Sequence, residues 1–117
     1  MIPVLTPEQM RAVDANSEVP VEVLIDRAGW SVAQAALRLL GGGYGRTVNI
    51  LAGPGNNGAD GRVAGDRLRA RGVQVRVVDA LSAPAELPAA DLVIDAAFGS
   101  GFRGRWRMPD IGDAPIL

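Results

Sequence analysis

A short apolar run that opens directly into a glycine-rich turn constrains this chain more than any other stretch. In the segment VNILAGPGNNGADG, Gly53, Gly55 and Gly58 match the G-x-G-x-x-G spacing of a dinucleotide-binding turn. The run from Thr47 to Ala52 is short and almost continuously apolar, as in a strand buried on both faces. A helix is expected to follow from about Gly61 to Arg71. A strand, a tight glycine turn and a helix in this order predict the start of a β-α-β unit.

Two helices are expected ahead of this unit, within residues 1–45. Thr6 is a suitable N-cap for the first, which should end near Ala15. The second is expected from about Val21 to Leu40, and Gly29 inside it indicates a close backbone approach. The apolar stripe of this helix is expected to consist of Leu24, Ala28, Ala35 and Leu39, opposite Arg27, Ser31, Gln34 and Arg38.

The remaining apolar segments predict further strands. GVQVRVV, which ends at Asp79, and DLVIDAAF are the expected second and third strands, and the closing APIL looks like the opening of a fourth. The pattern predicts a single α/β domain, residues 1–117, in which residues 46–117 form the first β-α-β units of a mainly parallel sheet, truncated at its C-terminal side. Ligands bind beyond the carboxyl ends of such strands. The turns Asn56–Asp60 and Asp95–Gly101 are therefore expected to face one crevice.

Composition narrows the possible chemistry. The 117 residues include no cysteine and no histidine, which removes disulfides, thiolate metal sites and the commonest general base. The formal net charge is −1, so a nucleic-acid partner is not expected. The sequence has neither a membrane-spanning apolar run nor a secretory leader pattern at its start, which favours a cytoplasmic location and no membrane partner. Any chemistry has to use carboxylates, amides, hydroxyls, arginines or backbone groups.

The glycine turn has competing interpretations from its residues alone. Asp79 ends the next strand about twenty residues later, where a dinucleotide site places its ribose-binding acid. Against this, Asp60 lies in the first turn of the expected helix and would repel a phosphate. Asn56 and Asn57 bring amide oxygens, which suit a polyhydroxyl or a hard cation. A purely structural turn with Asp60 as its helix cap is a third alternative.

Two signatures in order add a family resemblance. GPGNNGADG, followed after a second strand by VIDAAFGSG, resembles the paired signatures of the NAD(P)H-hydrate epimerases, the YjeF N-terminal domain family. The similarity covers nearly the whole chain and includes EQMRAVD and LIDRAG in the two leading helices. It implies a Rossmann-like three-layer α/β/α fold. It also implies an enzyme of nicotinamide cofactor repair, which interconverts the S and R forms of hydrated NADH and NADPH at C6 of the ring.

The implied reaction fits the residue types of the chain. A hydroxyl on the carbon beside the ring nitrogen is a carbinolamine, so the nitrogen lone pair can expel it and water can return to either face of the iminium. These steps need an acid and a base, and a carboxylate in a desolvated crevice can serve as both. The resemblance further implies one potassium ion per subunit as cofactor. It implies an ADP- or ATP-dependent NAD(P)H-hydrate dehydratase as functional partner, with fusion to the C-terminus as one arrangement, and it is compatible with a homodimer.

The resemblance also implies the residues of the site. Asp95 matches the aspartate at the end of the family's strand, as the catalytic residue and, with Asn57, as a potassium ligand. The implied substrate-binding residues are Asn56, Asn57, Gly58, Ala59, Asp60, Gly99, Ser100, Gly101, Phe102, Arg103, Gly104 and Arg105. Ala59 and Ser100 stand where glycine and threonine are common, and alanine is strained only if its φ is positive. The residues leave open whether Asp95 transfers protons, holds the ion or caps its loop.

Other features have plainer interpretations. Near the C-terminus, a basic and aromatic cluster comprises Phe102, Arg103, Arg105, Trp106 and Arg107. A solvated loop whose arginines meet cofactor phosphates is favoured over a nucleic-acid patch. Trp30 is expected in the core or at a subunit contact. Two alternatives for the whole chain are an NAD-binding oxidoreductase domain and a non-catalytic binding module on the same fold.

Overall fold

The computed structural model of the chain describes residues 19–98 and 106–117. Its elements, in chain order, are α2 (Val21–Leu40), β1 (Thr47–Ala52), α3 (Asn56–Arg69), β2 (Gln74–Asp79), the 3₁₀ helix η1 (Ala80–Ser82) and β3 (Leu92–Ala96). The helix predicted between residues 6 and 15 lies outside the described residues. No helix in the described part of the chain is long and apolar enough to cross a membrane.

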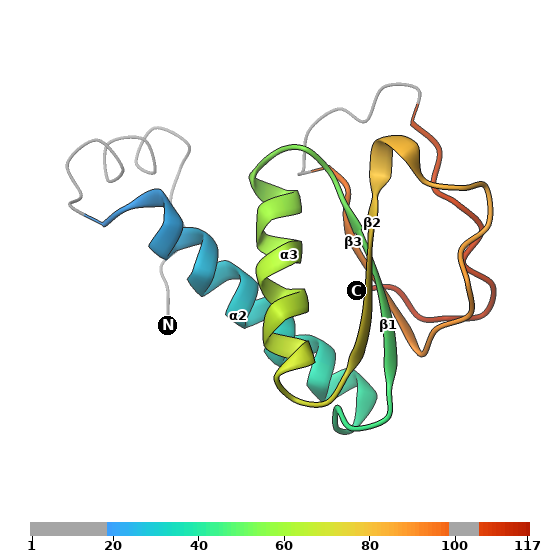
Figure 1. Cartoon of the computed structure of the whole chain (residues 1–117), viewed down its shortest axis with the longest axis horizontal. Helices are drawn as coiled ribbons and strands as arrows, with labels where there is room; N and C mark the ends of the chain where they lie inside the picture. The colour runs from blue at the N-terminus through green and yellow to red at the C-terminus, as the bar shows by residue number, and fades with distance from the viewer. Residues whose placement is uncertain (1–18, 99–105) are drawn as a thin grey trace.

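The three strands form one parallel sheet in the order β2-β1-β3. The helices α2 and α3 lie together on one face of this sheet, and the chain after β2 and the C-terminal segment lie on the other (Figure 1). The predicted α/β fold with a parallel sheet is therefore confirmed. Where a second helical layer was expected, the described residues 80–91 and 106–117 are mostly irregular, because prolines break the connection after η1.

The central strand β1 is the most deeply buried element. All of its residues except Thr47 are buried, which confirms the predicted strand with both faces covered. Its buried polar residue, Asn49, donates from Nδ2 to the carbonyl oxygen of Pro88 at 2.7 Å and accepts from Arg76 Nη1 at 3.2 Å. Asn49 therefore ties the irregular connection to the centre of the sheet, a role that the sequence analysis missed.

The C-terminal segment extends the sheet beside β3. The amide of Val93 donates to the carbonyl of Pro115 at 2.9 Å, and the amide of Leu117 donates back to Val93 at 2.9 Å. The amide of Asp95 then donates to the carbonyl of Leu117 at 3.1 Å. These bonds surround a parallel bridge between Val93 and Ile116, so the segment begins a fourth strand where the sequence predicted one.

The bounds of α2 agree with the prediction, but its predicted core stripe is wrong. Leu24 is 39% exposed and Leu39 is 60% exposed. The buried residues are instead Gly29, Ala33, Ala36 and Leu40. The reason is that α2 packs mainly on α3 and only lightly on the sheet, so small residues that let two helices approach closely take the inner face.

The far face of the sheet has its own apolar cluster, and Trp106 belongs to it. The indole packs beside Leu51 and Val93, contacts Phe98 edge to face at 5.4 Å between ring centroids, and donates from Nε1 to the carbonyl of Ala80 at 2.7 Å. Trp106 therefore has a structural role in this cluster. Trp30, by contrast, is 41% exposed on α2, so a core position for it is wrong.

Candidate functional site

The turn after β1 is compact because two of its glycines touch other backbone atoms. A Cβ built on Gly53 would lie 1.7 Å from the carbonyl oxygen of Ala97, and one on Gly58 would lie 1.8 Å from that of Gly53. Neither glycine has a positive φ. Both are therefore explained by close approach, which brings the ends of β1 and β3 against the start of α3.

The helix α3 begins five residues earlier than predicted, at Asn56 rather than Gly61. Gly55 is its extended N-cap, and the amide of Ala59 donates to the Gly55 carbonyl at 3.1 Å as in a first helical turn. Asn56 and Asn57 therefore lie in the first turn and Asp60 beyond it, so Asp60 is not the helix cap. No described residue other than glycine has a positive φ, so Ala59 is unstrained.

Asn57 joins the two turns that the sequence predicted to face each other. Its side-chain Nδ2 donates to the carbonyl oxygen of Phe98, just after β3, at 2.7 Å. The turns therefore leave neighbouring strands, as predicted, and meet at one edge of the sheet. Because the amide nitrogen donates to Phe98, the oxygen Oδ1 is the atom of this side chain that can serve a ligand as an acceptor.

A small cavity of about 130 Å³ lies between these turns. Asn57, Asp60 and Asp95 supply its polar wall, and the sequence analysis had named all three. The other lining residues are Val32, Gly61, Ile94, Ala96 and Leu117. Asn57 and Asp95 therefore share one cavity, which is the arrangement that a common ligand would need.

Asp95 lies in β3 opposite Leu51 of β1 and is half-buried. Its Oδ1 accepts a hydrogen bond from the amide of Ala97 at 3.2 Å. The capping interpretation of Asp95 is thus correct for one oxygen, and the residue also lines the cavity. The bond to Ala97 fixes the carboxylate at the end of its strand, where the turn begins.

Asp60 reaches the same cavity from α3. Burial raises the pKa of its carboxyl above the ordinary value of 3.8, because the charged form loses hydration. Asp60 and Asp95 are two carboxylates in one small space, and a group with a raised pKa keeps its proton to higher pH. Carboxyl groups in such a position are candidates for acid-base chemistry.

Replacing Asp60 by asparagine is expected to raise the Tm modestly at neutral pH in potassium-free buffer. A carboxyl whose pKa is higher in the folded state costs stability as the pH rises from 3.8 through the folded-state pKa, and the cost is complete above it. Asparagine carries no such cost. Thermal melts over a pH series should show a Tm gain at neutral pH that disappears below pH 3.8, and a gain that is equal at every pH would contradict this.

A second hollow, of about 410 Å³, opens at the N-terminus of α3. It is lined by Pro54, Gly55, Asn56, Asn57, Ala97 and Phe98. The start of a helix generally favours an anion, because the first amides have no partners within the helix, but the surface of this hollow is almost entirely apolar. The predicted second substrate loop, residues 99–105, lies outside the described residues, and its contacts stay a prediction.

Asp79, the predicted ribose-binding acid of an ordinary dinucleotide site, has a structural role. Its Oδ1 accepts from the amide of Leu81 at 2.9 Å and caps η1. This agrees with the interpretation of Asp79 as a turn residue.

The sequence pattern did not indicate the apolar wall of the small cavity. Val32 comes from α2, and Ile94 and Leu117 come from β3 and the strand that begins beside it. The signal was weak, because an apolar residue on a helix is most often ordinary core. Only the packing of α2 on α3 shows that Val32 lies at the site.

The donor set fits a hard cation. The cavity offers the amide oxygen of Asn57 and the carboxylates of Asp60 and Asp95, all of which are oxygen donors. A cavity of about 130 Å³ is large enough for an ion and a few waters. Oxygen donors are the type of ligand that the predicted potassium ion takes, and the ion itself stays a prediction.

The parallel sheet, the glycine turn and the cavity at the carboxyl ends of the strands define a Rossmann-like α/β protein. Residues 21–88 match the family model described as YjeF-related protein N-terminus, so the chain belongs to that family.

Curated relatives agree with this assignment. The chain is 36% identical, over 90% of its length, to the bifunctional NAD(P)H-hydrate repair enzyme Nnr of Hyperthermus butylicus, of which it covers 26%. It is 35% identical, over 85% of its length, to the NAD(P)H-hydrate epimerase of Neurospora crassa, of which it covers 52%. It is 45% identical, over 69% of its length, to the NAD(P)H-hydrate epimerase of Bordetella pertussis, of which it covers 34%. The chain thus spans about a quarter to a half of these relatives.

A solved structure supports the fold. The crystal structure of yeast ynu0 matches 92% of this chain with a TM-score of 0.62 at 24% identity, and the chain covers 61% of it.

Proposed function

We propose that the protein epimerises the S and R forms of hydrated NADH and NADPH at C6 of the nicotinamide ring. Membership of the family and the relatives named NAD(P)H-hydrate epimerase support this function. The observation that carries it is the small cavity, which Asn57 lines from the first turn of α3 and Asp95 from the end of β3. Exchange at a carbinolamine carbon needs proton transfer, and the carboxylates that line the cavity support that role.

In this proposal Asp95 works at the reacting carbon. As an acid it protonates the departing hydroxyl while the ring nitrogen supplies the electron pair that forms the iminium. As a base it then takes a proton from the water that adds to either face, so the two proton transfers balance. Its bond from the Ala97 amide holds the carboxylate in place during both steps. The buried part of the cavity wall, Ile94 and Ala96, would limit the access of water to one side of the cationic intermediate.

The remaining residues bind and orient the substrate. Residues 56–60, with the predicted loop 99–105, contact the dinucleotide, and the N-terminus of α3 faces a phosphate. Asn57 and Asp95 would hold the potassium ion. The bound ion would supply a fixed positive charge that orients oxygen atoms of the substrate or water. This assignment agrees with the hydrogen bond of Asn57. Its Nδ2 donates to the carbonyl of Phe98, so Oδ1 is the atom that would bind the ion.

The proposed reaction implies that the protein works together with a dehydratase. An ADP- or ATP-dependent NAD(P)H-hydrate dehydratase that accepts one epimer would dehydrate that epimer. Exchange between the epimers would then supply it with the other, so that both forms of the hydrate are repaired. One of the relatives is named a bifunctional repair enzyme, which supports a close association of the two activities. The cytoplasmic location and the homodimer stay predictions.

The direct test separates the two hydrate epimers by chromatography, starts from one of them, and follows its conversion with the full-length protein and potassium chloride. We expect exchange much faster than in buffer alone. Equal rates of epimer exchange with and without protein would reject the epimerase function. The alternative of a non-catalytic binding module would then remain. Equilibrium binding of the hydrate then shows whether the substrate site exists without catalysis.

Replacing Asp79 by alanine is expected to leave hydrate binding and epimer exchange within about twofold of the unmodified protein, as for a residue that does not touch the ligand. The reason is that Asp79 caps η1 at the Leu81 amide. An ordinary NAD-binding oxidoreductase predicts the opposite, a large loss of NAD affinity. Calorimetric titration with NADH and with its hydrate distinguishes the two. Loss of binding at full thermal stability would favour the oxidoreductase.

A further inference from the structure

One glycine of α2 touches the turn of α3 that carries Asp60. A Cβ built on Gly29 would lie 2.9 Å from the carbonyl oxygen of Asp60, 2.5 Å from Cγ1 of Val63 and 2.6 Å from Cβ of Val63. A rotation of the Val63 side chain cannot relieve the contact, because its Cβ is fixed to the backbone. The Asp60 carbonyl is backbone as well. Any side chain at position 29 therefore has to move one helix away from the other.

The same helix supplies a wall of the small cavity. Val32 follows Gly29 by about one helical turn and lines the cavity together with Asn57, Asp60 and Asp95. The position of Val32 relative to the two carboxylates is thus set by how closely α2 approaches α3. Gly29 lies at this contact, and it touches α3 at the residue whose side chain reaches the cavity.

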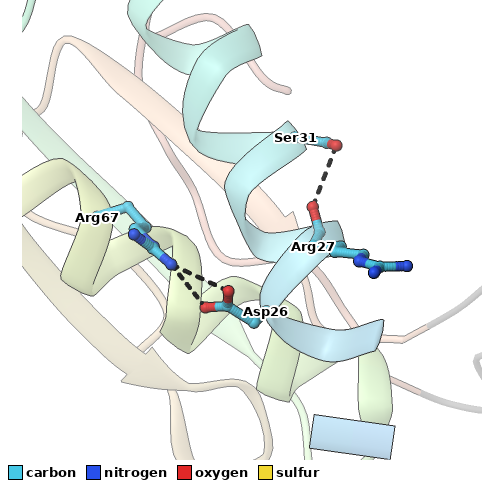
Figure 2. Close-up of polar contacts among 4 residues, drawn as sticks. All are labelled: Asp26, Arg27, Ser31 and Arg67. Carbon is cyan, nitrogen blue, oxygen red and sulfur yellow. Dashed lines mark hydrogen bonds and ion pairs between the residues drawn. The ribbon is translucent and has the colours of Figure 1, made fainter. Parts of the chain in front are cut away.

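An ion pair links the two helices on the outer side of this contact. Arg67 of α3 pairs with Asp26 of α2, with Nη2 at 2.9 Å and 3.0 Å from the two carboxylate oxygens (Figure 2). The guanidinium also lies 5.2 Å from the centroid of the Trp30 ring. Asp26 and Trp30 flank Gly29 along α2. The contacts of Arg67 and the close contact at Gly29 therefore involve the same stretch of helix.

We infer that Gly29 is a positioning residue of the epimerase site, which sets α2 against α3 so that Val32 closes the cavity around Asp60 and Asp95. This inference rests on the proposed function and assigns a role at that site to a helix outside both signature turns. Its mechanism is steric. A side chain at residue 29 displaces α2, Val32 moves outward, and water enters beside the oxygen donors. The ion and the reacting ring are then held less tightly.

The test compares three single variants of the full-length protein. Gly29→Ala displaces α2, and Val32→Ala opens the same wall without a new contact between the helices. Gly65→Ala is the control, because its Cβ would meet the ends of Ile50 and Val75 side chains at 3.2 Å and 3.3 Å, away from the cavity. Each variant is melted in potassium chloride and in choline chloride at equal ionic strength, and its KM and kcat for epimer exchange are measured.

Gly29→Ala and Val32→Ala should each raise both KM and the potassium concentration for half-maximal thermal stabilisation by roughly tenfold. Gly65→Ala should lower the Tm and leave the potassium response unchanged. The inference is overturned if folded Gly29→Ala or Val32→Ala keeps the potassium response and KM of the unmodified protein. If Gly29→Ala does not fold, the potassium response and the KM of Val32→Ala alone decide whether the inference holds.

The potassium melts separate this inference from the proposed function. An unmodified protein that does not exchange the epimers rejects the function, while the melts of the variants still report on the cavity. An unmodified protein whose melt does not respond to potassium overturns the inference, because α2 would then have no ion site to enclose.

Discussion

Replacing Asp95 by asparagine is expected to lower kcat for epimer exchange by about 100- to 10,000-fold, the usual contribution of a positioned acid-base group. Asparagine has nearly the same shape but can neither give a proton to the departing hydroxyl nor take one from water. Its Oδ1 can still accept from the Ala97 amide, so the turn should keep its structure. The measurement is the exchange rate of the separated epimers at saturating substrate.

The matched control for this variant is Asp91→Asn, at the residue just before β3. Asp91 Oδ2 accepts from the amide of Thr47 at 2.8 Å, so it too bonds a backbone amide, but it is exposed and outside the small cavity. Asp91→Asn should exchange the epimers at the normal rate. If Asp95→Asn does the same with an unchanged Tm, Asp95 is a structural cap, and the acid-base role assigned to it is wrong.

The parts of the site that follow from chain order could be predicted from the sequence. A strand, a glycine turn and a helix recur in one arrangement, and parallel strands present their carboxyl ends at one edge of the sheet. This was enough to predict that the segments after β1 and β3 meet at one edge of the sheet, and the bond from Asn57 to Phe98, just after β3, confirms that they do. The bounds of α2 and β1 were also correct, because their apolar patterns end at clear glycine turns.

The parts that depend on packing between helices could not be predicted. The sequence favoured Leu24 and Leu39 for the inner face of α2, since large apolar residues are normally buried. The structure exposes them, because the inner face of α2 is formed by Gly29, Ala33, Ala36 and Leu40, and Leu24 and Leu39 lie off this face. The role of Val32 was hidden for the same reason. The start of α3 was also misjudged, because its first turn contains asparagines and a glycine that are typical of loops.

The second large effect concerns the glycine turn itself. Gly53→Ala is expected to destabilise the protein by about 3 kcal/mol or more, at the upper end for an added core methyl. The new Cβ would lie 1.7 Å from the Ala97 carbonyl oxygen and 2.7 Å from its carbonyl carbon, so the backbone of either turn has to move. The Tm measured by calorimetry should fall by more than about 10 °C for a domain of this size.

Gly55→Ala is the control two residues away. A Cβ on Gly55 meets no atom within 4 Å, and the extended conformation of this residue, with φ −89° and ψ −166°, is open to alanine. The change should stay within about 1 kcal/mol, the loss expected when alanine occupies a helix N-cap. The two variants separate the explanations of the glycine pattern. If the glycines mainly provided loop flexibility, both substitutions would have similar effects. If they allow the ends of β1 and β3 to meet, only Gly53→Ala should be severe, and loss of the potassium response should accompany it because Asn57 and Asp95 separate.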